Sequence, residues 1–203
     1  MASSSLEGPV SRYLNRRLSR PLARLLAPTP ATPNAVSVTA FAVALGALAL
    51  LGAGRNLEAA VLIQTSSVVD GADGDLARLK GAASRFGGLF DAFLDRYADA
   101  AIIGGLAWWA AAHQRWPAPL VVGLAALAGA LTVSYSRARL EREGGPDAAA
   151  ALLGLASRDV RLLILATGAL FGQAYWTLAL VAALSWATVA WRLAASRNAL
   201  GRP

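Results

Sequence analysis

The chain of 203 residues contains no cysteine and a single histidine. Without cysteine it has no disulfide bonds, no thiolate nucleophile and no zinc site built on thiolates. The lone histidine, His113, lies at the end of an apolar run that contains two tryptophans. An imidazole ring suits a membrane interface at such a position, and we expect His113 to have no chemical role. Metal-binding or acid–base chemistry in this chain is therefore expected from oxygen-bearing side chains.

Charge is also scarce, at 15% of the residues, whereas 56% of the residues are hydrophobic. A chain this apolar is not an ordinary soluble domain. Its Ala/Leu runs reach the roughly 20 residues that a helix needs to cross a bilayer, and they lack the alternation of a membrane β-barrel. The predicted fold is an all-α, polytopic membrane protein.

Six segments have the length and composition of transmembrane helices. Their approximate bounds are 35–53, 57–77, 86–112, 117–138, 159–174 and 175–194. The first span begins beyond residue 30 and no Ala-x-Ala type cleavage site follows a short apolar core, so we expect no removable signal peptide. No internal repeat or low-complexity linker divides the chain, and we predict one membrane domain over residues 1–203 with a six-helix bundle over 35–194.

Residues 9–27, before the first span, combine apolar side chains at helical spacing with arginines between them. This pattern is typical of an amphipathic helix that lies in the membrane interface, and we predict one on the inner leaflet. A solvated basic tail is the alternative. The prolines of PTPATPN end this helix, and Asn34 is a suitable cap for the next one.

Basic residues indicate the orientation of the bundle. With the N-terminus inside, only Arg55 and Arg115 of the 19 Lys and Arg residues fall in outer segments. The positive-inside rule then places both termini on the cytoplasmic side, with a loop over about 141–157 as the longest inner connection. Anionic lipid headgroups explain the net charge of +7 better than nucleic acid does, because no aromatic-basic platform is present.

Six of the twelve acidic residues lie within residues 68–100. Asp70 and Asp73 are three residues apart and Asp91 and Asp95 are four apart, so each pair projects from one face of its helix. A short loop joins the two helices, which makes the pairs neighbours at the inner membrane boundary. Such carboxylates repel one another and are costly to bury unless a cation neutralises them. Oxygen ligands alone favour Mg²⁺ or Mn²⁺ over zinc, and we expect two ions.

The residues between the acidic pairs suit phosphate binding. Gly74 and Gly87 permit close backbone approach, while Arg78, Lys80 and Arg85 place positive charge beside the metal. Each feature alone has a plainer explanation, since glycines pack membrane helices and inner basic residues set topology. Their joint spacing favours a site. Two further acids of the stretch are Asp75, which we expect to pair with a nearby base, and Asp99, one turn beyond Asp95.

This spacing resembles the signature of the CDP-alcohol phosphotransferases, also called CDP-alcohol phosphatidyltransferases. The full pattern is Asp70-x2-Asp73-Gly74-x2-Ala77-Arg78-x8-Gly87-x3-Asp91-x3-Asp95. The segments TPN, SYSRARLE and SRDVRLLIL resemble further landmarks of that family, so the resemblance covers most of the chain. It implies a membrane enzyme that transfers a phospho-alcohol group from a CDP-alcohol to a hydroxyl group and releases CMP.

The resemblance also implies roles for individual residues. The metal ligands would be Asp70, Asp73 and Asp91, with Asp95 as the general base and a further ligand. The CDP-binding residues would be Asp73, Gly74, Ala77, Arg78 and Gly87. The metal would bridge the diphosphate as CMP leaves, while the base takes the proton from the acceptor hydroxyl. The family further implies a homodimer.

Four arginines, Arg137, Arg139, Arg158 and Arg161, flank the same inner mouth. They exceed what a diphosphate needs and favour a phosphorylated polyol as acceptor, although topology signalling is an alternative. In branches that use inositol phosphate a Glu-Arg-x-x-Arg element is expected, and this chain has Ser157 in place of the glutamate.

The amino-acid sequence of the motif resembles most closely that of the di-myo-inositol phosphate phosphate synthases, the branch that joins CDP-inositol to inositol phosphate. A phosphatidylinositol-phosphate synthase, with CDP-diacylglycerol as donor, is the nearest alternative. A cation transporter is the rival class, because carboxylates within membranes also mark ion pathways. A transporter would place them near the middle of the bilayer on interrupted helices, away from arginines.

Overall fold

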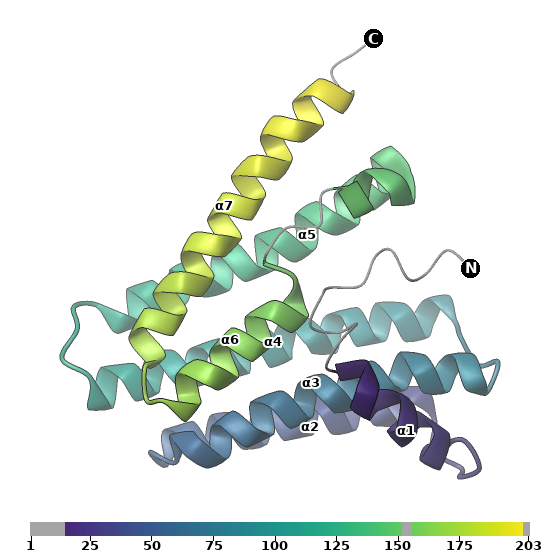
Figure 1. The fold of residues 1–203 in the computed structure, drawn as a ribbon, viewed down its shortest axis with the longest axis horizontal. Coiled ribbons are helices and arrows are strands. Elements are labelled where there is room, and N and C mark those ends of the chain that lie inside the picture. The colour runs from purple at the N-terminus through teal and green to yellow at the C-terminus, as the bar shows by residue number, and fades with distance from the viewer. Residues whose placement is uncertain (1–14, 152–155, 201–203) are drawn as a thin grey trace.

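The computed structural model describes residues 15–151 and 156–200, with side chains for 15–142 and 156–196. All regular structure in these ranges is helical, which confirms the all-α prediction (Figure 1). The elements are α1 (Arg16–Leu26), α2 (Pro33–Gly52), α3 (Asn56–Leu79), α4 (Arg85–His113), α5 (Pro119–Ala151), α6 (Arg158–Leu170) and α7 (Ala174–Leu200).

Each predicted span corresponds to one helix from α2 to α7, and the bounds of α2, α3 and α4 agree to within two residues. The expected inner loop is wrong over its first part, because α5 continues to Ala151. The alanine run that follows Pro146 has a high helix propensity, whereas Gly144, Gly145 and Pro146 disfavour a helix and are typical of the predicted loop. The predicted interfacial helix corresponds to α1, and residues 9–14 of that prediction lie outside the described residues.

Three stretches of the described residues are long and apolar enough to cross a membrane, namely Pro33–Gly52, Pro119–Arg142 and Ala174–Ser196. The helices α3 and α4 have sufficient length but carry the charges of the acidic stretch. Helix α6 has 13 residues, fewer than the roughly 20 of a perpendicular span. The count of six spans stays a prediction.

The cap of helix α2 lies two residues before the predicted cap, Asn34. The side chain of Thr32 accepts a hydrogen bond from the backbone N–H of Ala35, and Pro33 occupies the first helical position. Proline suits this position because its missing N–H would have no intrahelical partner and its fixed φ angle matches a helix. Thr32, and not Asn34, is therefore the cap.

Small residues let the helices of the bundle pack closely. Helix α2 packs against α3 and α4, α6 lies on α3, and α5 pairs with α7 (Figure 1). At Gly168 of α6, a Cβ atom would lie 1.9 Å from Oγ1 of Thr177 in α7, so only glycine fits there. The interior is alanine-rich, with Leu51, Ile63 and Leu106 among its fully buried side chains.

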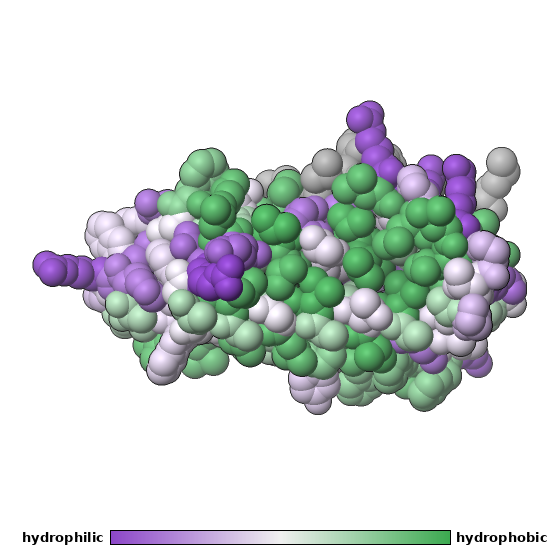
Figure 2. All heavy atoms as spheres, turned by 90° about the horizontal axis from the view of Figure 1, so that it is seen from below, coloured by the Kyte–Doolittle hydropathy of each residue, from purple (hydrophilic) through white to green (hydrophobic). Residues whose placement is uncertain are grey.

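Helix α1 lies across α3 near the α3–α4 turn (Figure 1). Its buried Ala23 packs with Ala72 and Leu76 of α3. Leu18 and Leu25, on another face, are 57% and 72% exposed, as expected for a helix whose apolar face meets lipid. Exposed apolar side chains also cover a broad part of the bundle surface (Figure 2).

Aromatic residues gather at the opposite end of the bundle. Trp116 stacks with Tyr175 and meets Trp176 edge to face. His113 stacks on Trp109, and Nδ1 of His113 lies 3.0 Å from the backbone carbonyl oxygen of Trp109. Such a group of amphipathic rings is typical of a membrane–water interface.

Candidate active site

Helices α3 and α4 bring the two predicted acidic pairs together. Asp70, Asp91 and Asp95 each offer a carboxylate oxygen, and these oxygens all lie within 4.8 Å of one another. Asp73, one turn along α3 from Asp70, lines a cavity with Asp91 and accepts a hydrogen bond from the hydroxyl of Ser37 in α2. The four carboxylates therefore occupy one region between α2, α3 and α4.

This group of carboxylates fits a divalent cation. Oδ1 of Asp91 is buried and has no hydrogen-bond partner among the described residues. Buried polar atoms are normally satisfied, and a cation would supply the missing partner while reducing repulsion between the carboxylates. The ligand set is made of oxygens alone, which suits Mg²⁺ or Mn²⁺.

Arg158, at the start of α6, inserts its guanidinium group among the same carboxylates. Its Nη1 lies 2.6 Å from Oδ2 of Asp70 and 2.8 Å from Oδ1 of Asp95. The sequence predicted Arg158 only as a binder of the acceptor phosphate. The structure places it between two predicted metal ligands as well, where it offsets part of their negative charge and where an incoming cation would displace or reposition it.

Asp99 connects the partly buried Arg158 to the buried Arg161. Oδ2 of Asp99 accepts a 2.7 Å hydrogen bond from Nη2 of Arg161, and Oδ1 lies 3.4 Å from Nε of Arg158. The side chains of Asp99 and Arg161 are both 2% exposed. Asp99 was left outside the predicted site, although its place one turn beyond Asp95 on α4 was a signal that it faces the same way.

A cavity of about 190 Å³ lies beside the carboxylates, between the start of α2 and the α3–α4 turn. All five predicted CDP-binding residues line it, which are Asp73, Gly74, Ala77, Arg78 and Gly87. A Cβ atom at Gly87 would lie 3.1 Å from Oγ of Ser84, so the glycine keeps this wall of the cavity open. Ser84 itself caps α4 by accepting a hydrogen bond from the N–H of Gly87.

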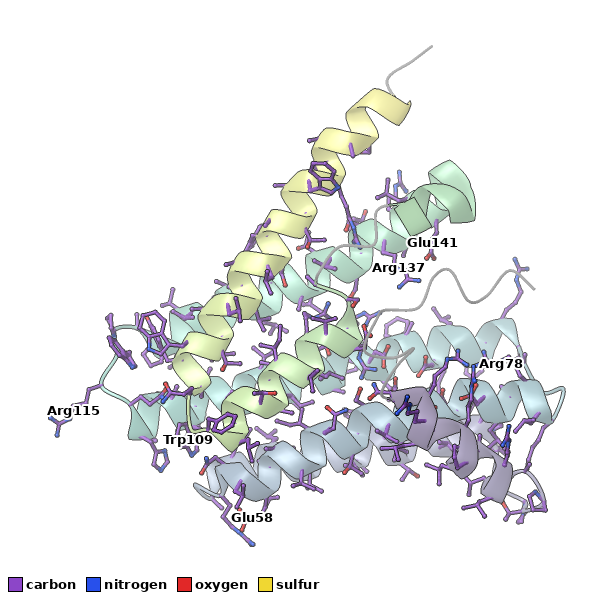
Figure 3. All side chains as sticks on the ribbon, viewed as in Figure 1. Glu58, Arg78, Trp109, Arg115, Arg137 and Glu141 are labelled. Atoms are coloured by element: carbon purple, nitrogen blue, oxygen red, sulfur yellow. The ribbon has the colours of Figure 1, made fainter. Side chains whose placement is uncertain are left out.

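A second cavity, of about 470 Å³, lies between α4, α5, α6 and α7. Three of the four predicted acceptor arginines line it, namely Arg137, Arg158 and Arg161, whereas Arg139 is not among its lining residues. Figure 3 shows Arg137 and Glu141 on the part of α5 that faces this region. Asp91 lines both cavities, and Asp95 also lines the second, so both cavities adjoin the carboxylates.

Sequence reasoning missed Arg192 of α7 as a residue of the second cavity. Its side chain is buried, and Nη1 donates to the carbonyl oxygen of Val133 at 2.6 Å and to Oγ of Ser136 at 2.8 Å. The available signal was a single basic residue near the end of an apolar helix, because charges in such segments usually serve a site. Arg192 had been read only as a topology signal.

Asp75 lies apart from the carboxylate group. Its Oδ1 is 2.7 Å from Nη2 of Arg78 and 3.2 Å from Nη1 of Arg16 in α1. The prediction that this residue pairs with a nearby base is confirmed. Arg78 therefore lines the first cavity while it also forms an ion pair on the side of α1.

Together these features define a class, an all-helical membrane protein whose largely buried carboxylates adjoin two cavities that contain arginine side chains. Residues 30–195 match the family described as CDP-alcohol phosphatidyltransferase, and the chain belongs to this family. It is an integral membrane enzyme, a CDP-alcohol phosphotransferase that takes a CDP-alcohol as donor and an alcohol as acceptor. This identification decides against the transporter.

Relatives with established names come from bacteria and archaea. The bifunctional IPC transferase and DIPP synthase of Rubrobacter xylanophilus is 47% identical over 172 residues, which are 84% of this chain but 38% of that protein. The phosphatidylinositol phosphate synthase of Mycobacteroides abscessus is 32% identical over 97% of this chain and 91% of its own length. The archaetidylinositol phosphate synthase of Pyrococcus horikoshii is 33% identical over 91% and 95%.

Solved structures of the Mycobacterium tuberculosis phosphatidylinositol phosphate synthase share the fold. The structure with CDP-DAG bound has a TM-score of 0.74 at 31% identity and covers 87% of this chain and 92% of that chain. The complex with manganese and citrate has a TM-score of 0.75 at 31% identity, with 86% and 87% covered.

Proposed function

We propose that the enzyme transfers an inositol-phosphate group from CDP-inositol to a hydroxyl of inositol phosphate and releases CMP. The observation that carries the proposal is the cavity of about 470 Å³ lined by Arg137, Arg158 and Arg161, which adjoins the carboxylates and is separate from the proposed CDP site. An arginine-lined cavity suits a phosphorylated, water-soluble acceptor. The 47% identity to a protein named a DIPP synthase supports the same choice.

In this proposal the donor nucleotide binds in the smaller cavity, against Gly74, Ala77, Arg78 and Gly87. Asp70, Asp73, Asp91 and Asp95 would hold Mg²⁺ or Mn²⁺, which we propose as two ions. When bound, such ions neutralise the charge that develops on the diphosphate oxygens as CMP leaves. The complex of a related synthase with manganese supports this choice of cofactor.

Asp95 is the proposed general base. It lies at the inner wall of the acceptor cavity, and its Oδ1 is 2.8 Å from Nη1 of Arg158. There it would take the proton from the acceptor hydroxyl as the hydroxyl oxygen attacks the phosphorus of the donor and the bond to CMP breaks. Arg137 and Arg161 would hold the acceptor phosphate in place.

The second candidate is a phosphatidylinositol-phosphate synthase with CDP-diacylglycerol as donor. It is supported by the Mycobacteroides abscessus synthase, which is 32% identical over 97% of this chain. The complex of the Mycobacterium tuberculosis synthase with CDP-DAG points the same way.

A product assay distinguishes the two candidates. The purified protein is supplied with inositol phosphate, Mg²⁺ and either CDP-inositol or CDP-diacylglycerol, and products are identified by mass spectrometry. We expect CMP and a water-soluble phosphodiester from CDP-inositol. A lipid product from CDP-diacylglycerol alone would replace the first candidate by the second. Asp95→Asn should remove turnover with either donor but leave much of the CDP binding, and near-normal turnover would remove Asp95 from its role.

Three larger features are proposed with this function: a single membrane domain, a homodimer, and an active site and termini on the cytoplasmic side. The dimer rests on the resemblance to the family, and native mass spectrometry of the purified protein tests it. A monomer at all protein concentrations would contradict it. The orientation rests on the distribution of basic residues.

A further inference from the structure

A third cavity lies on the other side of Arg78 from the proposed CDP site. It has a volume of about 230 Å³ and is lined by Arg20, Arg24, Asp75, Arg78 and Leu79. It is thus formed between α1 and the C-terminal end of α3, and Figure 3 shows Arg78 beside α1. Arg20 and Arg24 line neither the proposed CDP site nor the proposed acceptor cavity.

Asp75 is the single carboxylate that lines this cavity, and it already forms ion pairs with two arginines. Both Arg16 and Arg78 contact Oδ1 of Asp75, and the hydroxyl of Ser19 donates to Oδ2 at 3.1 Å. Arg20 and Arg24 form no ion pair within the described part of the chain. They are one helical turn apart, and like charges at this spacing repel each other. The cavity therefore has an excess of positive charge that a bound anion would balance.

The arginines project from a helix that is fixed in place. Ser19 and Ala23 of α1 are buried against α3, and Asn15 donates a 2.9 Å hydrogen bond to Oγ of Ser67. A Cβ atom at Gly71 would lie 3.4 Å from Cβ of Ser19, so the two helices are in close contact. A flexible basic tail would lose more conformational entropy on binding an anion than this preorganised helix does.

We propose that this cavity is a binding site for a phosphate group, held by the guanidinium groups of Arg20, Arg24 and Arg78. Arginine suits this ligand because its planar group of donors can bind two phosphate oxygens at once. The phosphate could belong to a soluble ion or to an anionic lipid headgroup. Leu18 and Leu25 lie on a different face of α1 from the arginines, so the cavity opens away from the face that meets lipid.

Binding to the full-length protein in detergent tests this site without reference to turnover. Inorganic phosphate is titrated by calorimetry, and phosphatidylglycerol is compared with phosphatidylcholine by native mass spectrometry. Arg20→Gln and Arg24→Gln should each weaken phosphate-group binding about fivefold, the loss expected for one basic residue. Arg17→Gln is the matched control, since Arg17 is an exposed arginine of α1 that does not line the cavity, and it should change binding less than about twofold.

The two ligands identify the source of the phosphate. If Arg24→Gln weakens the binding of inorganic phosphate, the site takes soluble phosphates. If Arg24→Gln weakens only the binding of phosphatidylglycerol, the site takes a lipid headgroup. Equal effects of Arg17→Gln and Arg24→Gln would overturn the proposal, because they would indicate general charge attraction. Unchanged binding in both cavity variants would overturn it as well. The thermal midpoint of each variant without ligand verifies that folding is intact.

Discussion

At the residue scale, Asp99 forms ion pairs with two arginines of the proposed acceptor cavity without lining that cavity itself. We expect Asp99→Asn to release Arg161, whose charge-assisted hydrogen bond is worth about 1.5–3 kcal/mol. Because Arg161 lines the proposed acceptor cavity, the KM for the acceptor should rise about tenfold or more, and the KM for the CDP-alcohol should change little.

The ratio of the KM for the acceptor to the KM for the CDP-alcohol distinguishes a positioning role of Asp99 from a purely structural one. Removal of one partner of a buried ion pair also lowers stability, so the assays are run well below the thermal midpoint of the variant. A purely structural role would lower the fraction of active enzyme and leave both KM values alone. Equal increases in the two KM values would contradict a positioning role toward the acceptor.

Metal binding can be tested at Asp91, whose Oδ1 has no other partner among the described residues. Asp91→Asn should weaken Mn²⁺ binding by more than about tenfold, the lower limit seen when even an outer-shell partner is lost. The affinity is measured from the electron paramagnetic resonance signal of free Mn²⁺. Asp75→Asn is the control, since Asp75 lies nearby on α3 but is committed to Arg16 and Arg78. Equal losses in the two variants would argue against a metal at the carboxylate group.

The acidic residues could be predicted from the sequence because their geometry is local. Spacings of three and four residues place Asp70 with Asp73 and Asp91 with Asp95 on helix faces, and one short turn joins the helices. The contacts of Arg158 could not be predicted in this way. Arg158 is 88 residues from Asp70 in the sequence, and the two residues meet only because α6 packs against α3. No local sequence pattern predicts this packing.

At the scale of elements, helix α6 is positioned by its close contact with α7. The 1.9 Å separation between a Cβ at position 168 and Oγ1 of Thr177 means that Gly168→Ala forces the helices apart. Overpacking of this kind costs about 1–3 kcal/mol. Because α6 also carries Arg158 and Arg161, the variant should raise the KM for the acceptor as well as lower the thermal midpoint.

Gly104→Ala is the matched control for this change. A Cβ atom at Gly104 of α4 meets no atom within 4 Å, so the substitution should leave the thermal midpoint and both KM values close to those of the parent. Purified proteins are compared by thermal unfolding in detergent and by turnover. A variant at Gly168 that is as stable and active as the one at Gly104 would mean that the α6–α7 contact does not position the arginines.

Helix existence was more predictable than helix ends. The apolar runs of α2, α3 and α4 are bounded by prolines, glycines and charges, and their predicted ends are within two residues. The end of α5 was mispredicted because residues from about 141 to 157 were read as a loop, although the charged residues at the start of this range are compatible with a helix that leaves the membrane.

At the scale of the whole molecule, three turns meet at one end of the bundle. Nδ2 of Asn56, after the α2–α3 turn, donates to the carbonyl oxygen of Ala169, and Nε2 of Gln114 donates to that of Gly172. Figure 3 shows Glu58, Trp109 and Arg115 at this end and Arg78 at the other. Six helices that each cross the membrane would place these three turns on one side, so the arrangement is compatible with the prediction of six spans.

The absence of cysteine makes this topology directly testable by single-cysteine labelling in intact cells. Six spans with the N-terminus inside place Arg115→Cys and Phe171→Cys outside and Pro30→Cys inside. If only the three most apolar helices, α2, α5 and α7, crossed the membrane, position 115 would still be outside but position 171 would be inside. Phe171 is 70% exposed, so its accessibility to reagent is not limited by packing. We expect a membrane-impermeant maleimide to label Phe171→Cys before permeabilisation, and labelling only afterwards would contradict six spans.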